Sequence, residues 1–164
     1  MTDRSQCDPA PSTGRGCLIV CGLPGSGKTT EAKRLSTHRP GVRFAPDEWL
    51  IALDVNLWES SIRQRVESLQ WTTAKDLLRV GATVIIEWGT WGRVERDVLR
   101  TEARDLGATV ELRYLDVPLD ELWRRIRSRD MEDPPVKRPD LDDWSRMFQV
   151  PDEAEVRLYD RPPV

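Results

Sequence analysis

Cysteine and histidine are scarce in this sequence. The three cysteines, Cys7, Cys17 and Cys21, form no metal-binding spacing, and His38 is the one histidine. Cys17 and Cys21 share one apolar run, in which they lie too far apart along a strand to form a disulfide. The sequence therefore gives no basis for zinc chemistry or for a Ser-His-Asp hydrolase. A reducing, cytoplasmic compartment is expected.

Long apolar runs and an excess of positive charge are also missing. No run approaches the ~18 apolar residues of a membrane span, and the first residues are polar rather than a signal peptide, so no membrane partner is expected. The formal net charge of −3 and the pI of about 5.3 argue against general affinity for long nucleic acid. Such binding depends mainly on neutralising phosphates. A local basic patch remains compatible with the composition.

Glycine is concentrated in one segment, residues 22–29, which reads GLPGSGKT. This segment fits the Gly-x-x-x-x-Gly-Lys-Ser/Thr phosphate-binding loop at every fixed position, and it lies between an apolar run and a helical pattern, as the motif requires. Loop amides and the helix N-terminus bind phosphate, Lys28 can reach the β- and γ-phosphates, and the Thr29 hydroxyl can ligate Mg²⁺. We expect ATP with Mg²⁺ here, although no motif distinguishes ATP from GTP. The predicted nucleotide-binding residues are Gly22, Pro24, Gly25, Ser26, Gly27, Lys28, Thr29 and Thr30.

The length of 164 residues suits one domain. Residues 1–16 lack periodicity, which predicts a flexible tail, and residues 17–164 would form the domain. Strands are predicted at 17–21, 42–45, 83–87 and 109–115, and helices at 30–35, 58–80, 93–106, 119–129 and 141–148, with a weak helical stretch after 151. In the longest helix, the predicted buried face is Ile62, Val66, Leu69, Thr73 and Leu77. We therefore expect an α/β fold, a P-loop NTPase three-layer sandwich with a parallel sheet of four to five strands.

Two carboxylates follow predicted strands, at the sheet edge where open α/β folds bind ligands. Asp47 could accept the proton of an acceptor hydroxyl as the hydroxyl attacks the γ-phosphate; the alternative role is a helix N-cap. Glu87 could hold a Mg²⁺-bound water or bind the acceptor; the alternative is a plain charge at a strand end. Both are candidate substrate-binding residues, and Glu87 is, with Thr29, a candidate metal residue.

Four arginines lie close together after the fourth predicted strand, at positions 124, 125, 127 and 129. Arg125 and Arg129 are four residues apart, so they share one face of a helix. They could clamp the charge of the transferred phosphoryl group in a lid at about 118–140, of which 131–139 would be a loop. The alternative is a solvated charged face in which Glu121 pairs with Arg125.

The segments 116–129, DVPLDELWRRIRSR, and 141–148, LDDWSRMF, carry a family resemblance. From about 17 to 148 the chain resembles the small P-loop kinases, AAA-type ATP-binding proteins related to polynucleotide kinase, zeta toxin and chloramphenicol phosphotransferase. The resemblance implies that Arg125 and Arg129 are lid arginines, that Asp47 is the general base, and that the sheet order is 2-3-1-4. In the polynucleotide branch an arginine follows the base by three positions. Leu50 stands there instead, which argues against a nucleic-acid acceptor.

The predicted acceptor site is rich in tryptophan. Trp49, Trp88 and Trp91 could form the wall of a site for a flat or apolar small molecule, although a core role is also open for Trp88 and Trp91. Arg93 could bind an acidic group of the acceptor or the phosphate itself. The expected function is an ATP-dependent kinase that acts on a small-molecule hydroxyl, with Lys28, Asp47, Arg125 and Arg129 as catalytic residues. The alternatives are a 5′-hydroxyl polynucleotide kinase and a nucleotide-dependent switch or binding module; the sequence does not indicate an oligomeric state.

Overall fold

The structure, a computed structural model, describes residues 14–129 and 132–160. Most of the predicted N-terminal tail lies outside these residues. The sheet contains the four parallel strands β1 (Gly16–Cys21), β2 (Val42–Phe44), β3 (Val84–Ile86) and β4 (Thr109–Tyr114), in the order β2-β3-β1-β4. The α/β class and the order 2-3-1-4 are thus confirmed, and β1 begins one residue before the predicted start of the domain.

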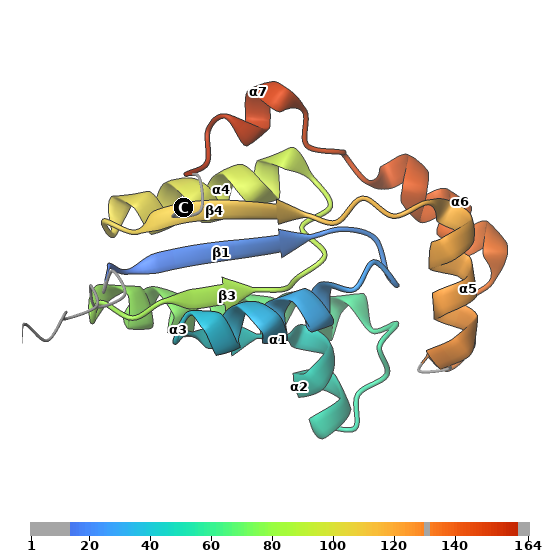
Figure 1. Ribbon diagram of the computed structural model, residues 1–164. Helices are drawn as coiled ribbons and strands as arrows, with labels where there is room; N and C mark the ends of the chain where they lie inside the picture. The colour runs from blue at the N-terminus through green and yellow to red at the C-terminus, as the bar shows by residue number, and fades with distance from the viewer. Residues whose placement is uncertain (1–13, 130–131, 161–164) are drawn as a thin grey trace, which may run out of the picture.

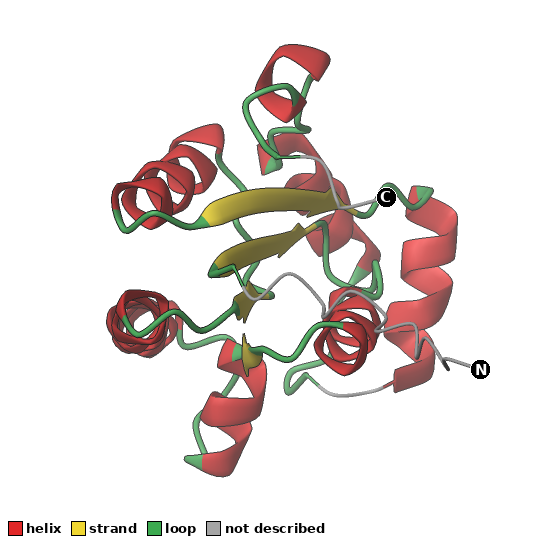
Figure 2. Ribbon diagram, turned by 60° about the vertical axis from the view of Figure 1, so that its left-hand side comes forward, coloured by secondary structure: helices red, strands yellow, loops and turns green. Residues whose placement is uncertain are grey.

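Helices surround this sheet. They are α1 (Lys28–His38), α2 (Pro46–Ala52), α3 (Ser60–Arg79), α4 (Arg93–Asp105), α5 (Leu119–Arg129), α6 (Arg138–Met147) and α7 (Glu153–Val156). Figure 2 shows helices on both sides of the strands, which is the expected three-layer arrangement. In Figure 1, α5 and α6 lie beyond the arrowheads of β1 and β4, so they stand over the carboxyl ends of the strands.

Strand β1 is buried on both faces, and alternate residues therefore enter different cores. Leu18 and Val20 pack with Ala32 and Leu35 of α1. On the opposite face, Cys17 and Ile19 belong to the larger core that α3 and α4 complete. This double burial explains the unbroken apolar run, since neither face of the strand meets water.

The buried face of α3 differs from the predicted one. Leu69 is 63% exposed and Thr73 is also exposed, whereas Gln70 is fully buried. Gln70 accepts a hydrogen bond from the Trp88 indole N–H at 2.8 Å, so its polar amide is satisfied inside the core. The buried residues of α3 are Val66, Gln70, Trp71, Ala74 and Leu78. The prediction from apolar spacing was wrong for Leu69 and Thr73, because Gln70 occupies the inward face, whereas Val66 is buried and Leu77 packs against the core.

The lid region forms its own small core. Leu122, Ile126, Val136 and Leu141 are buried together between α5 and α6. Helix α6 begins at Arg138, inside the predicted 131–139 loop. Pro139 is tolerated in the first turn of a helix. The Asp140 carboxylate also caps the helix start, since it accepts the Lys137 backbone N–H at 2.7 Å. The lid thus has two helices joined by a loop.

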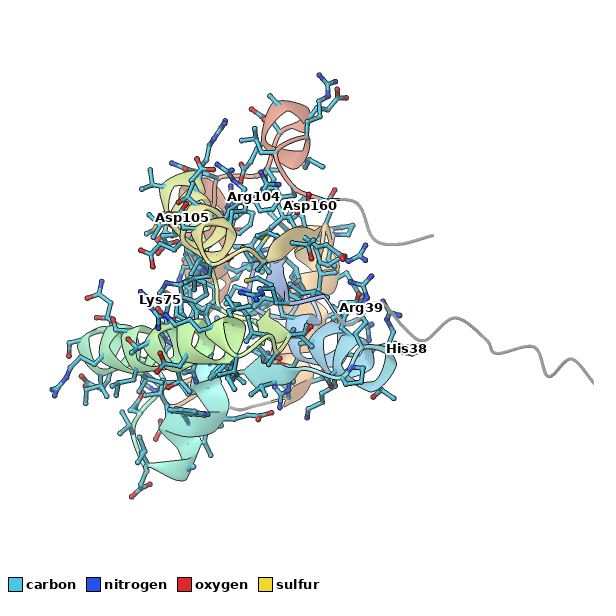
Figure 3. All side chains as sticks on the ribbon, turned by 90° about the vertical axis from the view of Figure 1, so that its left-hand side faces the viewer. His38, Arg39, Lys75, Arg104, Asp105 and Asp160 are labelled. Carbon is cyan, nitrogen blue, oxygen red and sulfur yellow. The ribbon has the colours of Figure 1, made fainter. Side chains whose placement is uncertain are left out.

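Figure 3 shows the end of the molecule opposite the lid, where His38 and Arg39 lie near one side and Arg104, Asp105 and Asp160 near the other. Nδ1 of the His38 ring lies 2.7 Å from the Arg34 carbonyl oxygen, so the ring caps this end of α1. Asp160 pairs with the free edge of β4, since its N–H donates to the Val110 carbonyl and its carboxylate accepts the Val110 N–H, each at 2.7 Å. Within the described ranges, no helix combines the length and the apolarity needed to cross a bilayer.

Candidate active site

The phosphate-binding loop connects β1 to α1. Gly22, Gly25 and Gly27 have φ values of 151°, 82° and 97°, a region that side chains rarely occupy. Lys28 donates to the carbonyls of Gly22 and Leu23 at 3.0 and 3.1 Å. Burial lowers the pKa of Lys28 to about 8. The positive charge of Arg129 also lowers this pKa, whereas the negative charge of Asp47 raises it. The lysine is therefore buried against its own loop, with the proposed base and a lid arginine both near enough to influence it.

Gly25 brings the loop into contact with the lid helix. A Cβ at this position would lie 3.1 Å from a side-chain carbon of Ile126 and 3.2 Å from the Leu122 carbonyl oxygen. Both neighbours belong to α5, and the loop carbonyl of Gly25 also accepts a long 3.4 Å hydrogen bond from Arg125. The loop and the lid helix therefore pack directly on each other.

Gly25→Ala is expected to lower the free energy of unfolding more than Gly81→Ala does. Both glycines have positive φ, but a Cβ at Gly81 meets nothing within 4 Å. Gly81→Ala should therefore cost only the backbone term of about 1–2 kcal/mol, whereas Gly25→Ala also displaces α5. Urea unfolding of both variants measures the difference, and equal costs would contradict the close packing of loop and lid.

Glu87 lies directly beside the loop threonine. The Thr29 hydroxyl donates to one carboxylate oxygen of Glu87 at 3.1 Å, and the guanidinium of Arg43 on β2 lies 2.9 Å from the other oxygen. Burial raises the pKa of Glu87, while Arg43 and Thr29 oppose this shift. A hydroxyl and a buried carboxylate are oxygen donors of the kind that Mg²⁺ prefers, so these residues fit the predicted metal site. No pattern in the sequence pointed to Arg43 as a site residue.

Asp47 is the second residue of α2. Its carboxylate is 54% exposed and forms an ion pair with Arg63 of α3 at 2.7 Å. The N-cap of α2 is Ala45, so the alternative role of Asp47 as an N-cap is wrong. Leu50, which replaces the arginine of the polynucleotide branch, is fully buried beneath the helix. Arg63 instead supplies a guanidinium beside Asp47, and it is a site residue that the sequence did not reveal.

The lid arginines are held by acidic neighbours. Arg125 pairs with Glu121 at 2.6 Å, as the alternative reading of this helix predicted, and Arg129 pairs with Glu132 at 2.5 Å. Both arginines nevertheless line the same cavity as the phosphate-binding loop. The ion pairs are partly exposed, so they are weak and can be exchanged for a phosphate.

One cavity of about 770 Å³ unites these groups. Among the predicted nucleotide-binding residues, Gly22 and Ser26 lie outside its lining. Its lining includes Pro24, Gly25, Gly27, Lys28, Thr29, Thr30, Asp47, Glu87, Trp88, Trp91, Arg125 and Arg129. The loop between α5 and α6 reaches the segment before α3, where the Trp58 indole donates to the Pro134 carbonyl at 2.9 Å.

The tryptophans are distributed differently from the prediction. Trp49 lies outside the cavity lining and is 40% exposed. Trp88 lines the cavity but is also core, since it is buried and packs edge-on against Trp71. Trp91 lines the cavity together with Trp58 and Trp144, two tryptophans that the sequence analysis did not assign to the site. The aromatic wall therefore comes from three separate segments.

Arg93 also lies outside the cavity lining. Its guanidinium is 3.6 Å from Asp97 and 3.8 Å from Asp152, so the side chain is directed toward α4 and the C-terminal segment. As the first residue of α4, Arg93 is displaced from the cavity because the turn that precedes the helix presents Trp91 instead. The structure therefore does not bring Arg93 together with the other predicted site residues.

A buried arginine fixes the turn that carries Trp91. Arg96 of α4 is fully buried and binds Glu155 of α7 with two hydrogen bonds of 2.6 and 2.9 Å. It also donates to the carbonyl of Thr90 at 2.9 Å, at a residue whose φ is 40°. Such a φ is strained for a threonine. The Arg96–Glu155 pair therefore ties the cavity wall to the C-terminal segment.

The parallel sheet, the glycine loop at the C-terminal end of β1 and the helical lid define a P-loop protein with the fold of the small P-loop kinases. The chain belongs to the AAA domain family, whose model matches residues 18–151. No curated protein matches the chain.

Solved structures of similar fold support this class. The chain of an RNA repair complex of Pnkp1, Rnl and Hen1 superposes with a TM-score of 0.69 and 19% identity over 92% of this chain and 48% of that one, so this chain spans about half its length. Kti12 from Chaetomium thermophilum in complex with ADP-AlF3 gives a TM-score of 0.63 and 19% identity, and the match covers 86% of this chain and 93% of Kti12. A gluconokinase from Sinorhizobium meliloti gives a TM-score of 0.60 and 18% identity, and the match covers 87% of this chain and 79% of the gluconokinase. The shared feature is the fold.

Proposed function

We propose that this protein is a Mg²⁺-ATP-dependent kinase that transfers the γ-phosphoryl group to a hydroxyl of a small molecule. One observation carries the proposal: a single cavity joins the phosphate-binding loop, the Asp47 carboxylate and the lid arginines. Its volume of about 770 Å³ is within the range of small-molecule sites. The neighbours that are kinases support the same reaction class.

The nucleotide end of the cavity would hold the triphosphate. The loop amides and Lys28 would bind the β- and γ-phosphates, and Thr29 and Glu87 would hold Mg²⁺, which would offset phosphate charge. Arg125 and Arg129 exchange their carboxylate partners for the transferring group, so residues 118–140 act as a lid. Most of the catalysis in such reactions comes from positioning and electrostatics.

The acceptor end would be organised by Asp47. The acceptor oxygen attacks the γ-phosphorus, the bond from that phosphorus to the oxygen of ADP breaks, and Asp47 takes the hydroxyl proton. The 2.7 Å ion pair with Arg63 orients the Asp47 carboxylate. Cys17 and Cys21 are free, buried thiols, which suits a reducing compartment, so we place the protein in the cytoplasm.

ATP affinity is expected to fall as pH rises above about 8. Burial lowers the pKa of Lys28 to about 8 in the free protein, whereas bound phosphates require the protonated form. Binding above this pKa must therefore take up a proton, and affinity should drop more than about tenfold between pH 7.5 and 9.5. Titration calorimetry measures the ATP affinity across this pH range. Lys28→Arg is the control, because arginine stays charged over the same range. A flat profile for the natural protein would contradict the assignment.

Acceptor-dependent ADP release with Mg²⁺-ATP tests the proposal. Nucleosides, sugars, hydroxylated antibiotics and 5′-hydroxyl oligonucleotides form the panel, and stimulation by one small-molecule class is the expected result. The similarity to a chain of an RNA repair complex supports a second candidate, a 5′-hydroxyl polynucleotide kinase, and stimulation by oligonucleotides alone would favour it. Tight ATP binding with no stimulation, together with a partner whose affinity differs between ATP and ADP, would favour a switch module instead.

A further inference from the structure

Two carboxylates that line the cavity, Glu67 and Glu95, form no ion pair with an arginine in residues 14–129 and 132–160. Three cavity carboxylates are paired: Asp47 with Arg63, Glu87 with Arg43, and Glu132 with Arg129. Glu67 of α3, by contrast, has no hydrogen bond or ion pair with any residue in 14–129 or 132–160, although it lines the same cavity. Glu95 of α4 uses one oxygen to accept the Gly92 N–H at 3.0 Å and also lines the cavity. The acceptor half is therefore short of positive charge.

Glu67 and Glu95 lie close enough to repel each other. Burial raises the pKa of Glu67 to about 7; Arg63 lowers it, while the charges of Glu95 and Asp47 raise it further. Arg63 is one helical turn before Glu67 on α3, but its guanidinium is turned toward Asp47 and the Leu57 carbonyl. A ligand with positive charge would relieve this repulsion, whereas a phosphate or carboxylate would increase it.

Three indole rings line the same cavity as these two carboxylates. Trp58 precedes α3, Trp91 follows β3, and Trp144 lies on α6; the ring centres of Trp58 and Trp144 are 5.8 Å apart and those of Trp91 and Trp144 are 6.0 Å apart. Gly89 makes room for the Trp91 ring, since a Cβ there would lie 2.3 Å from the indole nitrogen. Indole faces attract cations as well as apolar surface. A cavity that is lined by both aromatic rings and carboxylates without an arginine partner is suited to an organic ammonium group.

We propose that the acceptor is an amino alcohol: a hydroxyl compound that also carries a protonated amine, whose ammonium group lies between Glu67, Glu95 and the tryptophans. This inference rests on the proposed function, because the hydroxyl of the same molecule must reach Asp47. The amine is a recognition group and is not modified.

Matched pairs of probes test the proposal. Glucosamine is compared with glucose, and 2-amino-1-phenylethanol with 1-phenylethanol, by calorimetry and by quenching of tryptophan fluorescence in the nucleotide-free and ATP-analogue-bound protein. In at least one pair the amine should bind about tenfold or more tightly than its neutral partner. Glu67→Gln should reduce this preference to about twofold or less, because the charge is removed and the shape is kept. Glu153→Gln, at a carboxylate that is 89% exposed on α7, is the matched control and should leave the preference unchanged.

The pH profile gives a second readout. Amine binding should strengthen as pH rises through about 7, where Glu67 ionises. The charged groups facing Glu67 are Arg63 on its own helix, Glu95 on α4 and Asp47 on α2. The pH dependence of amine binding should disappear in Glu67→Gln. Equal binding of amine and neutral partner in both pairs would overturn the proposal, and so would a preference that survives Glu67→Gln.

The amine inference and the kinase proposal fail in distinguishable ways. If a neutral or anionic acceptor stimulates ADP release while the amines do not bind preferentially, the kinase stands and the amine inference is overturned. If an amine binds with the Glu67-dependent preference and yet no amino alcohol stimulates ADP release, the cation site stands and the proposed kinase reaction is overturned.

Discussion

Asp47→Ala is expected to reduce acceptor-dependent ADP release by about 10²–10⁴-fold, the usual contribution of a positioned general base. The carboxylate lines the cavity and is ion-paired to Arg63 at 2.7 Å, so its loss removes the proton acceptor and leaves Arg63 without its partner. Steady-state kinetics should show the loss in kcat, since the acceptor can still bind to the tryptophan wall.

ATP affinity is the companion measurement for this variant. Asp47 raises the pKa of Lys28, so its removal should weaken ATP binding only at alkaline pH, and the comparison belongs near pH 7. Asp47→Asn separates shape from charge, and Asp76→Ala, at an exposed carboxylate far along α3, is the matched control. Unchanged turnover in Asp47→Ala with intact ATP binding would show that the assigned base is wrong.

Glu155→Ala is expected to produce the largest loss of stability, about 3–5 kcal/mol, because it leaves the fully buried Arg96 guanidinium uncompensated. For a chain of this size the melting temperature should fall by about 10 °C. Thermal unfolding followed by circular dichroism measures the change. The turn that carries Thr90 and Trp91 should loosen as well, since Arg96 holds both carbonyls.

Two further variants make the comparison specific. Glu153→Ala removes a carboxylate from the same short helix, but one that pairs with Arg157 at the exposed surface, and it should cost less than about 0.5 kcal/mol. Replacing both partners with apolar residues, as in Arg96→Met with Glu155→Leu, should recover much of the loss, because no charge is then left buried. A melting temperature for Glu155→Ala equal to that of Glu153→Ala would rule out the buried pair as a structural support.

Local patterns in the sequence were sufficient to predict the strands and the phosphate-binding loop. β1 is apolar on both faces, and the loop glycines are required by backbone angles, so both leave a direct trace in the sequence. The sheet order followed from the family resemblance rather than from periodicity. The buried face of α3 was predicted wrongly because Gln70 is inside the core, where Trp88 satisfies it.

The acceptor half of the site could not be predicted in the same way. Trp58, Arg63 and Glu67 lie near one another at the start of α3, whereas Trp144, which lines the same cavity, is far away in the sequence and no spacing links it to them. Their arrangement depends on how α3 and α6 pack around the carboxyl ends of the strands. Arg93, by contrast, was assigned to the site by sequence proximity to Trp91 and is turned away by the start of α4.

The Arg96–Glu155 pair also has a consequence for synthesis on the ribosome. The two residues are 59 positions apart, so Arg96 lacks its carboxylate partner until the segment around Glu155 has left the exit tunnel. The sheet and the phosphate-binding loop can form before that moment, whereas the Thr90–Trp91 turn cannot be fixed. The part of the cavity wall that Trp91 forms is therefore fixed later than the phosphate-binding loop, whose strand and helix lie earlier in the chain.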